Sequence, residues 1–192
     1  EKLSKEGGQF DWSKADFLEA LKGGEGWEVL LTSEHAALFR KTKDGHYIVC
    51  RKGENIDEEQ DGPGKSLRRI KVPGDVHGAV PLPNGHLLIT CGDGHKVIEL
   101  DAQEKVVWEL NENDLPGNPL RLMAGLQRLP NGNTVFCNYL GHGHLGKQPH
   151  FFEITPDKKV VWEFSDPTNF KTINQIQLLD VPGDVTKGEI LR

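Results

Sequence analysis

The sequence predicts an all-β protein, a β-propeller of four-stranded blades, and three observations predict it. Leu-Pro-Asn-Gly occurs at 82–85 and again at 129–132. Val-Val-Trp-Glu occurs at 106–109 and again at 160–163. Between these landmarks lie short β-branched runs separated by turn residues, four runs to a copy. Four-strand units that recur every ~40–50 residues are typical of propeller blades.

The clearest copy of the repeat covers approximately 76–120. Its strands are expected at 77–82, 86–91, 96–101 and 105–110. Asn84-Gly85 separates the first two and favours a tight hairpin, because both residues tolerate a positive φ. The polar residues 101–104 form the turn between the third and fourth strands.

The next copy covers approximately 121–172, with strands expected at 122–129, 133–139, 150–155 and 159–164. The loop between its second and third strands is seven residues longer than in the copy before it. Trp108 and Trp162 stand at the same place in the fourth strand, so we expect both indoles to pack between adjacent blades.

Two weaker copies flank these blades. Lys43-Asp44-Gly45 marks an earlier one over about 35–75, and a partial one covers 173–192. Residues 1–34 differ from the repeat. Ser13 is expected to cap a short helix that ends at Gly23-Gly24, and 27–32 reads as a strand, so this segment is expected to pack on the first blade.

The blade number is small for a closed ring. Residues 35–192 hold three to four units, a partial ring, whereas propellers usually close with roughly four to eight blades. Three explanations stay open. The chain is part of a larger propeller, another chain completes the ring, or residues 1–34 close it.

Composition narrows the class of protein. The 192 residues carry 23 Lys and Arg against 29 Asp and Glu, a net charge of −6 without a basic block, which disfavours nucleic-acid binding. No apolar run approaches the ~18 residues of a membrane span. Cys50, Cys91 and Cys137 each end a β-branched run, so we expect buried strand residues rather than disulfides or a zinc site. The acidic run 57–61 is expected to form a solvated loop.

The blades at 82–110 and 129–164 resemble bacterial propellers of the pyrroloquinoline-quinone-repeat type, in the quinoprotein-dehydrogenase-like and arylsulfotransferase-like branch. The resemblance covers about 35–192 and implies export to the periplasm or cell surface, with several blades of the family missing here. In that group the quinone is held by a tryptophan floor, a vicinal disulfide and a calcium site. Adjacent cysteines and an EF-hand-like acidic loop do not occur in this sequence, so we predict no quinone cofactor.

Histidines supply the candidate site residues. His35 and His77 both begin a first strand, which is the innermost strand of a propeller blade, and Asn174 holds the equivalent position in the last copy. These three residues are expected at the mouth of the central channel, where imidazoles bind a metal, an anion or a polar ligand. The alternative is a pair of hydrogen-bonded structural histidines.

The other histidines lie in turns and in the long loop. His46, His86 and His95 come directly after turn glycines and are expected to be exposed. Three more, His142, His144 and His150, lie in the long loop and are candidates for a divalent metal such as zinc or copper, with a further ligand from elsewhere. An exposed loop that covers one face is the alternative. The GxGxxG at 141–146 precedes Pro149 and a strand instead of a helix, which excludes a dinucleotide site.

The sequence supports three functions. The first is a non-catalytic binding or scaffolding propeller that takes a small polar or sugar ligand, or a protein partner, through loops on one face. The second is a transferase, lyase or hydrolase acting on a small polar or sugar substrate, with His35 or His77 as general acid/base or nucleophile. The third is one part of an assembly in which another chain completes the ring.

Overall fold

The computed structural model describes residues 36–42, 44–61, 65–176 and 178. The helix and strand expected within 1–34 lie outside these residues, as does His35. No helix that could span a membrane occurs in the part of the chain that the structure describes.

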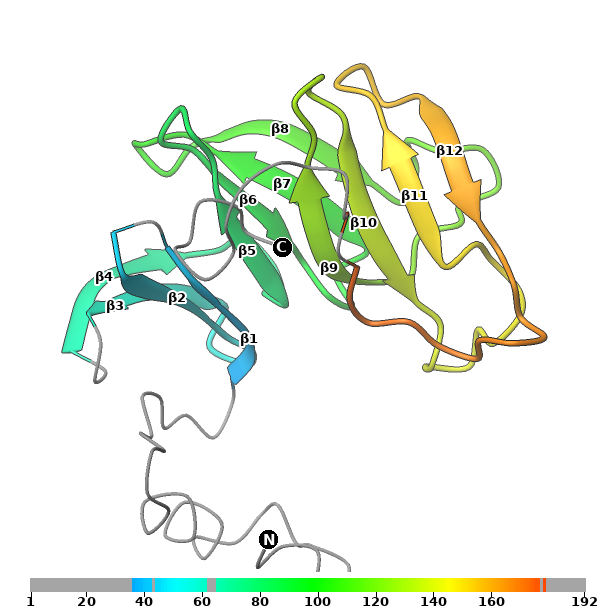
Figure 1. The fold of residues 1–192 in the computed structure, drawn as a ribbon, viewed down its shortest axis with the longest axis horizontal. Coiled ribbons are helices and arrows are strands. Elements are labelled where there is room, and N and C mark those ends of the chain that lie inside the picture. Colours follow the sequence, from blue (N-terminus) through cyan, green and yellow to red (C-terminus); the bar gives the residue numbers. More distant parts are fainter. Residues whose placement is uncertain (1–35, 43, 62–64, 177, 179–192) are drawn as a thin grey trace, which may run out of the picture. The chain divides into compact units, whose positions relative to one another are not determined.

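Three four-stranded antiparallel sheets make up the described fold, each with its strands in chain order (Figure 1). Blade 1 contains β1 (Ala36–Lys41), β2 (His46–Arg51), β3 (Ile56–Asp61) and β4 (Lys65–Lys71). Blade 2 contains β5 (Gly78–Pro81), β6 (Leu87–Thr90), β7 (Lys96–Leu100) and β8 (Val106–Asn111). Blade 3 contains β9 (Leu122–Arg128), β10 (Thr134–Tyr139), β11 (Phe151–Ile154) and β12 (Val160–Phe164). The predicted all-β fold of four-stranded blades is confirmed.

The turns between first and second strands differ from the predicted two-residue hairpin. Gly85 N–H donates to the Leu82 carbonyl at 3.0 Å, and Gly85 alone of the Asn-Gly pair has a positive φ, 82°. Asn84 instead accepts a hydrogen bond at its side-chain oxygen from the His86 N–H, at 3.0 Å. This is a three-residue loop with glycine in the left-handed position, and only glycine adopts that position without strain.

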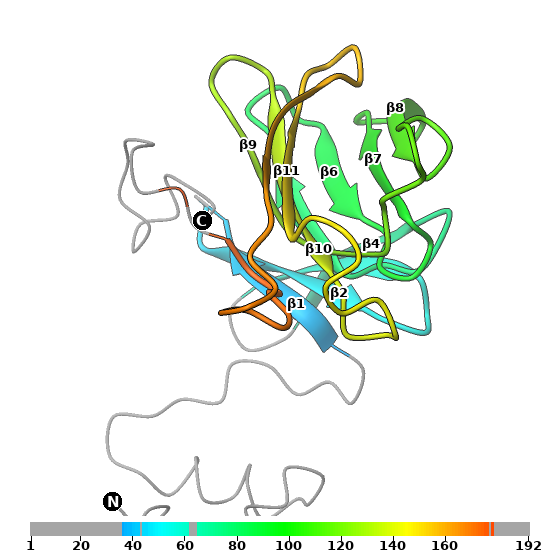
Figure 2. The same cartoon turned by 90° about the vertical axis from the view of Figure 1, so that its right-hand side faces the viewer.

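The blades pack through shared apolar cores. The first strands β1, β5 and β9 lie next to one another, as they do around a propeller axis (Figures 1 and 2). One core joins blades 1 and 2, and Ile48, Ile89 and Cys91 belong to it. A second core joins blades 2 and 3 around Leu88 and Phe136. The protein is therefore a β-propeller with three blades in its described part, which form a partial ring.

The acidic run 57–61 is not a solvated loop, as the sequence suggested, but lies in strand β3. Asp57 is 1% exposed and Glu58 is also buried. Glu58 pairs with Arg51 on β2 at 3.2 Å. The prediction was wrong because the neighbouring strands and the next blade enclose this acidic strand. Local composition does not reveal burial by segments that are distant in the sequence.

The three cysteines are buried, as the sequence predicted, and the two tryptophans differ. Cys50 lies in β2 and Cys137 in β10, and Cys91 comes directly after β6. Trp108 packs against the core of blades 2 and 3, and its indole N–H donates to the Pro156 carbonyl at 2.8 Å. Trp162 is 45% exposed, because no blade comes after blade 3 among the described residues. Packing between blades was thus predicted correctly for Trp108 but not for Trp162.

A polar pair recurs in every blade, where the second strand begins. His46 Nδ1 lies 2.7 Å from Glu59, and His86 Nδ1 lies 2.6 Å from Glu99. In blade 3 the Asn133 amide donates to Glu153 at 2.6 Å. His46 and His86 are therefore partly buried partners of third-strand glutamates rather than free, exposed turn residues. His95 is paired too, with Glu112 at 2.9 Å.

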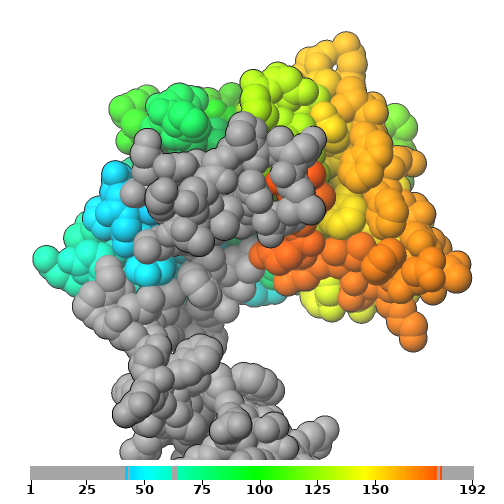
Figure 3. Space-filling model, in the orientation of Figure 1, coloured from blue at the N-terminus to red at the C-terminus, as the bar shows by residue number. Residues whose placement is uncertain are grey.

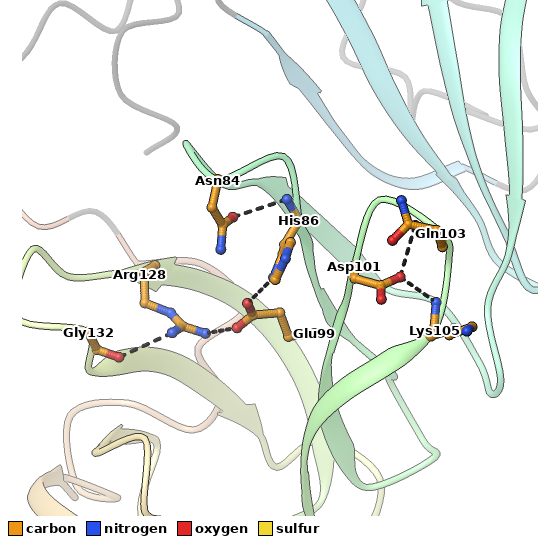
Figure 4. Close-up of polar contacts among 8 residues, drawn as sticks. All are labelled: Asn84, His86, Glu99, Asp101, Gln103, Lys105, Arg128 and Gly132. Atoms are coloured by element: carbon orange, nitrogen blue, oxygen red, sulfur yellow. Dashed lines mark hydrogen bonds and ion pairs between the residues drawn. The ribbon is translucent and has the colours of Figure 1, made fainter.

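In blade 2 this pair extends to the next blade. Figure 4 shows His86 and Arg128 pointing to opposite oxygens of Glu99, and Arg128 donates at 2.7 Å. Arg128 also donates to the Gly132 carbonyl and lies over the Trp108 ring, 6.0 Å from its centroid. Because Arg128 ends β9 and Glu99 lies on β7, the contact ties blade 2 to blade 3.

The segment after β12 returns to the inner side of blade 3. In Figure 3 its atoms, in orange, lie beside those of the third sheet. Asn174 accepts the Gly125 N–H at its carbonyl, at 3.0 Å, and a Cβ at Gly125 would collide with the side chain of Gln175. Glycine in the middle of β9 thus admits the returning segment.

Candidate functional site at one end of the blades

Loops of two kinds converge at the end of the blades opposite the recurring polar pair. One kind joins second and third strands, at 52–55, 91–95 and 140–150, and the other joins successive blades. Together with the segment after β12, they supply six polar side chains, here called the mouth cluster: Lys52, Asp75, His77, Asp93, His142 and Asn174.

An ionic chain crosses all three blades within this cluster. The Lys52 ammonium lies 3.6 Å from Asp75 and 3.6 Å from Asp93. On its other side, Asp93 contacts His142 Nδ1 at 3.0 Å. Lys52 lies just after β2, Asp93 just after β6, and His142 in the long loop after β10. The three loops are thereby linked by charge as well as by the packing of the sheets below them.

Backbone geometry brings Asp75 close to the turn of blade 2. Gly92 has a φ of +41°, and a Cβ there would lie 2.5 Å from an Asp75 carboxylate oxygen. The same oxygen faces the Asp93 N–H at 3.4 Å. Glycine at this position therefore permits both the left-handed turn and the close approach of the carboxylate.

His77 meets Asn174 across the mouth cluster. Its Nε2 lies 3.3 Å from the Asn174 side-chain oxygen, although 97 positions separate the residues. Because that oxygen can only accept, Nε2 carries the proton and Nδ1 keeps a lone pair. Nδ1 is buried and has no hydrogen-bond partner among the described residues. The sequence placed both residues at equivalent strand starts, and the structure brings these two together, with His35 outside the described residues.

Burial and charge set the protonation states of the cluster. Burial lowers the pKa of His77, and the Lys52 charge lowers it further, against opposing effects of Asn174, Asp75 and Asp93. Burial acts to raise the pKa of Asp93, but His142 and Lys52 outweigh it and leave that pKa below its ordinary value. At neutral pH the site therefore presents a neutral His77 imidazole beside an ionised Asp93 carboxylate.

The loop histidines do not surround one point. His144 accepts a hydrogen bond from Arg121 at 3.2 Å, and His142 faces Asp93. His150 is fully buried, and its two ring nitrogens face the Phe170 carbonyl at 3.0 Å and the Asp166 N–H at 3.4 Å. Within the described residues, no three His, Cys, Asp or Glu side chains gather as metal ligands would.

Sequence reasoning missed three members of the cluster, Lys52, Asp75 and Asp93. The signal that could have found two of them is positional, since Lys52-Gly53 and Gly92-Asp93 occupy the same turn in successive repeats. Asp75 carries no such signal, because its place depends on the chain between blades. The mouth cluster offers hydrogen-bond donors, acceptors and both signs of charge within one small region, which suits a polar ligand.

Comparison with known proteins supports the fold and leaves the activity open. No family model matches the chain, and no curated protein matches it. Among solved structures it is similar to a protein of unknown function from Bacteroides caccae, with 33% identity and a TM-score of 0.63, over 71% of this chain and 52% of that one. It is also similar to a streptogramin B lyase, with 17% identity and a TM-score of 0.52, over 72% of this chain and 44% of that one.

A third similar structure is the extracellular domain of a hybrid two-component system from Bacteroides thetaiotaomicron. It shows 19% identity and a TM-score of 0.54, over 80% of this chain and 20% of that one. These neighbours support the β-propeller architecture. The chain spans about half the length of the first two structures it matches.

Proposed function

We propose that this propeller is a non-catalytic binding protein that takes a small polar or sugar-like ligand at the mouth cluster. The observation that carries the proposal is the ionic chain that runs from Asp75 through Lys52 and Asp93 to His142 and links loops of three blades. Carboxylates accept hydrogen bonds from ligand hydroxyl groups, and an ammonium group donates to ligand oxygens. His77 and Asn174 extend the same surface with neutral polar groups.

An enzyme of the transferase, lyase or hydrolase type is the second candidate, and His77 favours it. A neutral imidazole at neutral pH is suited to general base catalysis, and burial lowers the His77 pKa in that direction. One similar structure is a streptogramin B lyase, a likeness that concerns the fold. In this alternative His77 accepts a proton from the substrate, and the contact between its Nε2 and Asn174 orients the imidazole ring.

Ligand-observed NMR against a panel of monosaccharides and small hydroxy acids tests both candidates. We expect binding of a panel member to be lost in Lys52→Ala and weakened in His77→Ala. His46→Ala is the matched control, since it removes a partly exposed histidine at the opposite end of blade 1. Equal binding by wild type and Lys52→Ala contradicts the binding site. Conversion of the bound compound by wild type but not by His77→Ala selects the enzyme.

Four further parts of the proposal concern the setting of the site. We propose a periplasmic or extracellular location, supported by the resemblance of the repeats and by the extracellular domain among the similar structures. We propose pyrroloquinoline-quinone-type repeats in a bacterial protein, supported by the Leu-Pro-Asn-Gly and Val-Val-Trp-Glu motifs. We also propose that 1–34 pack on the first blade of 35–192, and that another chain completes the ring. We do not propose a metal site formed by His142, His144 and His150. Both ring nitrogens of His150 already face hydrogen-bond partners, the Phe170 carbonyl and the Asp166 N–H.

A further inference from the structure

Arg121, directly before β9, differs from the other arginines whose side chains the structure describes. Arg51, Arg68, Arg69 and Arg128 each pair with a glutamate. Arg121 is half-buried, and it forms no ion pair with a carboxylate within the described part of the chain. A half-buried guanidinium in this state carries a charge that an anion can neutralise.

Neighbouring groups fix the Arg121 side chain in place. Its Nε–H donates to His144 Nδ1 at 3.2 Å, and Nη1 donates to the Leu120 carbonyl. Its backbone N–H donates to the side-chain oxygen of the buried Asn138 at 2.7 Å. These contacts use Nε and Nη1, whereas Nη2 has no acceptor among the described residues. A guanidinium that is already ordered loses little conformational entropy when it binds.

His144 adds a second donor at this place. Because its Nδ1 accepts from Arg121, the proton of the neutral ring lies on Nε2, which has no hydrogen-bond partner in the part of the chain that the structure describes. Burial lowers the pKa of His144, and the charges of Arg121, Lys147, His95 and His142 lower it further. At neutral pH the ring is therefore neutral and offers its Nε2–H to an acceptor.

Glu112 is the carboxylate whose pKa responds to Arg121, and it is engaged elsewhere. It contacts His95 Nδ1 at 2.9 Å. A hydrogen bond with His95 holds its pKa below the ordinary value, with smaller contributions from the Asn118 side chain and from the Arg121 charge. Since His95 and Asn118 hold this carboxylate, the guanidinium stays without an acid.

Arg121 adjoins the mouth cluster. The Met123 N–H donates to the Gly92 carbonyl at 2.9 Å, which sets the start of β9 beside the turn that carries Asp93. His142 contacts Asp93 at 3.0 Å, from the same loop that supplies the histidine partner of Arg121. A ligand of modest size can therefore reach both places.

We propose that Arg121 and His144 bind an oxyanion, the carboxylate or phosphate group of a ligand whose hydroxyl groups lie on the mouth cluster. Charge-assisted hydrogen bonds from Nη2 and a bond from the His144 Nε2–H hold its oxygens. Lys52 is unsuited to this role, since its ammonium already lies between Asp75 and Asp93. This anion site rests on the ligand binding proposed above and narrows its class to acidic sugars, sugar phosphates and hydroxy acids.

Inorganic phosphate and acetate are the probes that test the anion site. Each is titrated against chloride at equal ionic strength, and long-range proton–nitrogen NMR spectra follow the imidazole of His144, with His144→Gln to assign its signals. We expect saturable shifts and a rise in the His144 pKa, because a bound anion offsets the Arg121 charge that lowers it. Tighter binding of acetate points to a carboxylate ligand, and tighter binding of phosphate points to a phosphate ester.

Three variants separate the site from the general charge of the surface. Arg121→Gln is expected to weaken anion binding about tenfold or more, the effect of losing a charge-assisted hydrogen bond. Arg121→Lys keeps the charge without the Nη2 donors and is expected to lie between wild type and Arg121→Gln. Lys147→Gln is the matched control, because it removes a positive charge near His144 from an exposed residue that donates only to the Gly143 carbonyl. We expect it to change binding much less.

Three results overturn the anion site: no saturable shift in wild type with either anion, equal affinity in wild type and Arg121→Gln, or equal weakening by Arg121→Gln and Lys147→Gln. Far-UV circular dichroism shows whether Arg121→Gln folds, and Arg121→Lys decides the outcome if it does not, since affinity equal to that of wild type then contradicts the site.

Glucose and glucuronate, which differ only in the group at one carbon, connect the anion site to the mouth cluster. We expect glucuronate to bind wild type more tightly than glucose does, and the two to bind Arg121→Gln equally. If neither sugar binds, the sugar ligand proposed for the mouth cluster fails, while the phosphate and acetate titrations still decide the anion site. Failure of one is thereby distinguished from failure of the other.

Discussion

Asp57 is a carboxylate enclosed at the junction of blades 1 and 2. It lies on β3 opposite Cys50 and Ile70, both of which belong to the core shared by these blades. Burial raises the pKa of Asp57 from 3.8 to about 7, and a hydrogen bond with the Cys50 thiol opposes that rise only in part. Replacement of Asp57 by Asn keeps the size of the side chain and removes its charge.

The sign and size of the effect come from the two pKa values. Because the folded protein binds this proton more tightly than the unfolded chain does, the free energy of unfolding falls as pH rises from 3.8 to about 7 and is level above that. A shift of about three pKa units corresponds to about 4 kcal/mol of stability lost over that interval. Cys91 in the same core stays neutral throughout, because burial raises its pKa to about 12.

Urea unfolding at a series of pH values from acid to mildly alkaline measures this effect. We expect Asp57→Asn to gain stability relative to wild type as pH rises, by about 4 kcal/mol in total, and to be the more stable protein above neutral pH. Asp61→Asn is the matched control, because Asp61 lies on the same strand with its side chain 40% exposed. The reasoning is refuted if wild type and Asp57→Asn lose stability in parallel over this range.

Three further predictions concern the joints and the site. Trp108→Phe removes the indole donor to Pro156 and is expected to lower the free energy of unfolding by about 1 kcal/mol, whereas Trp162→Phe leaves monomer stability unchanged in urea titrations. Glu99→Gln replaces the buried carboxylate that pairs with His86 and Arg128 and is expected to lower the free energy of unfolding by about 3 kcal/mol. The exposed Glu104→Gln is expected to lower it by less than about 0.5 kcal/mol. Similar losses in both variants argue against a stabilising contact between blades 2 and 3 at Glu99. Lys52→Met removes a positive charge near His77 and is expected to raise the His77 pKa measured by NMR, while a fall contradicts the arrangement of the cluster.

Local pattern was enough to predict the strands of blades 2 and 3. The run 86–91 became β6 over Leu87–Thr90, and 96–101 became β7 over Lys96–Leu100, because alternation and turn residues act within a few positions of each other. The same pattern failed at Asp57, where the next blade causes the burial. The negative charge of this segment predicts exposure to solvent, but the packing of the sheet against the next blade buries Asp57 instead.

The candidate site was predictable only where the repeat carried information. His77 and Asn174 were found because equivalent positions in successive repeats come to the same place around the axis, and they lie within 3.3 Å. Lys52 and Asp93 occupy the same turn in successive repeats, but their ion pair joins loops of different blades, and no spacing within one repeat shows that pairing. The exposure of Trp162 likewise depends on whether another blade packs against blade 3, and the strand itself carries no sign of that.

The long loop of blade 3 is anchored firmly at its base. Asn138 accepts the Arg121 N–H at 2.7 Å and donates to the Pro119 and Pro149 carbonyls. At the end of the loop, the His150 ring is buried and contacts the Phe170 carbonyl. Between these anchors, residues 141–147 carry no core side chain. We therefore expect substitutions and insertions within 141–147 to leave the core of blade 3 unchanged, because the side chains that anchor the loop lie outside that stretch.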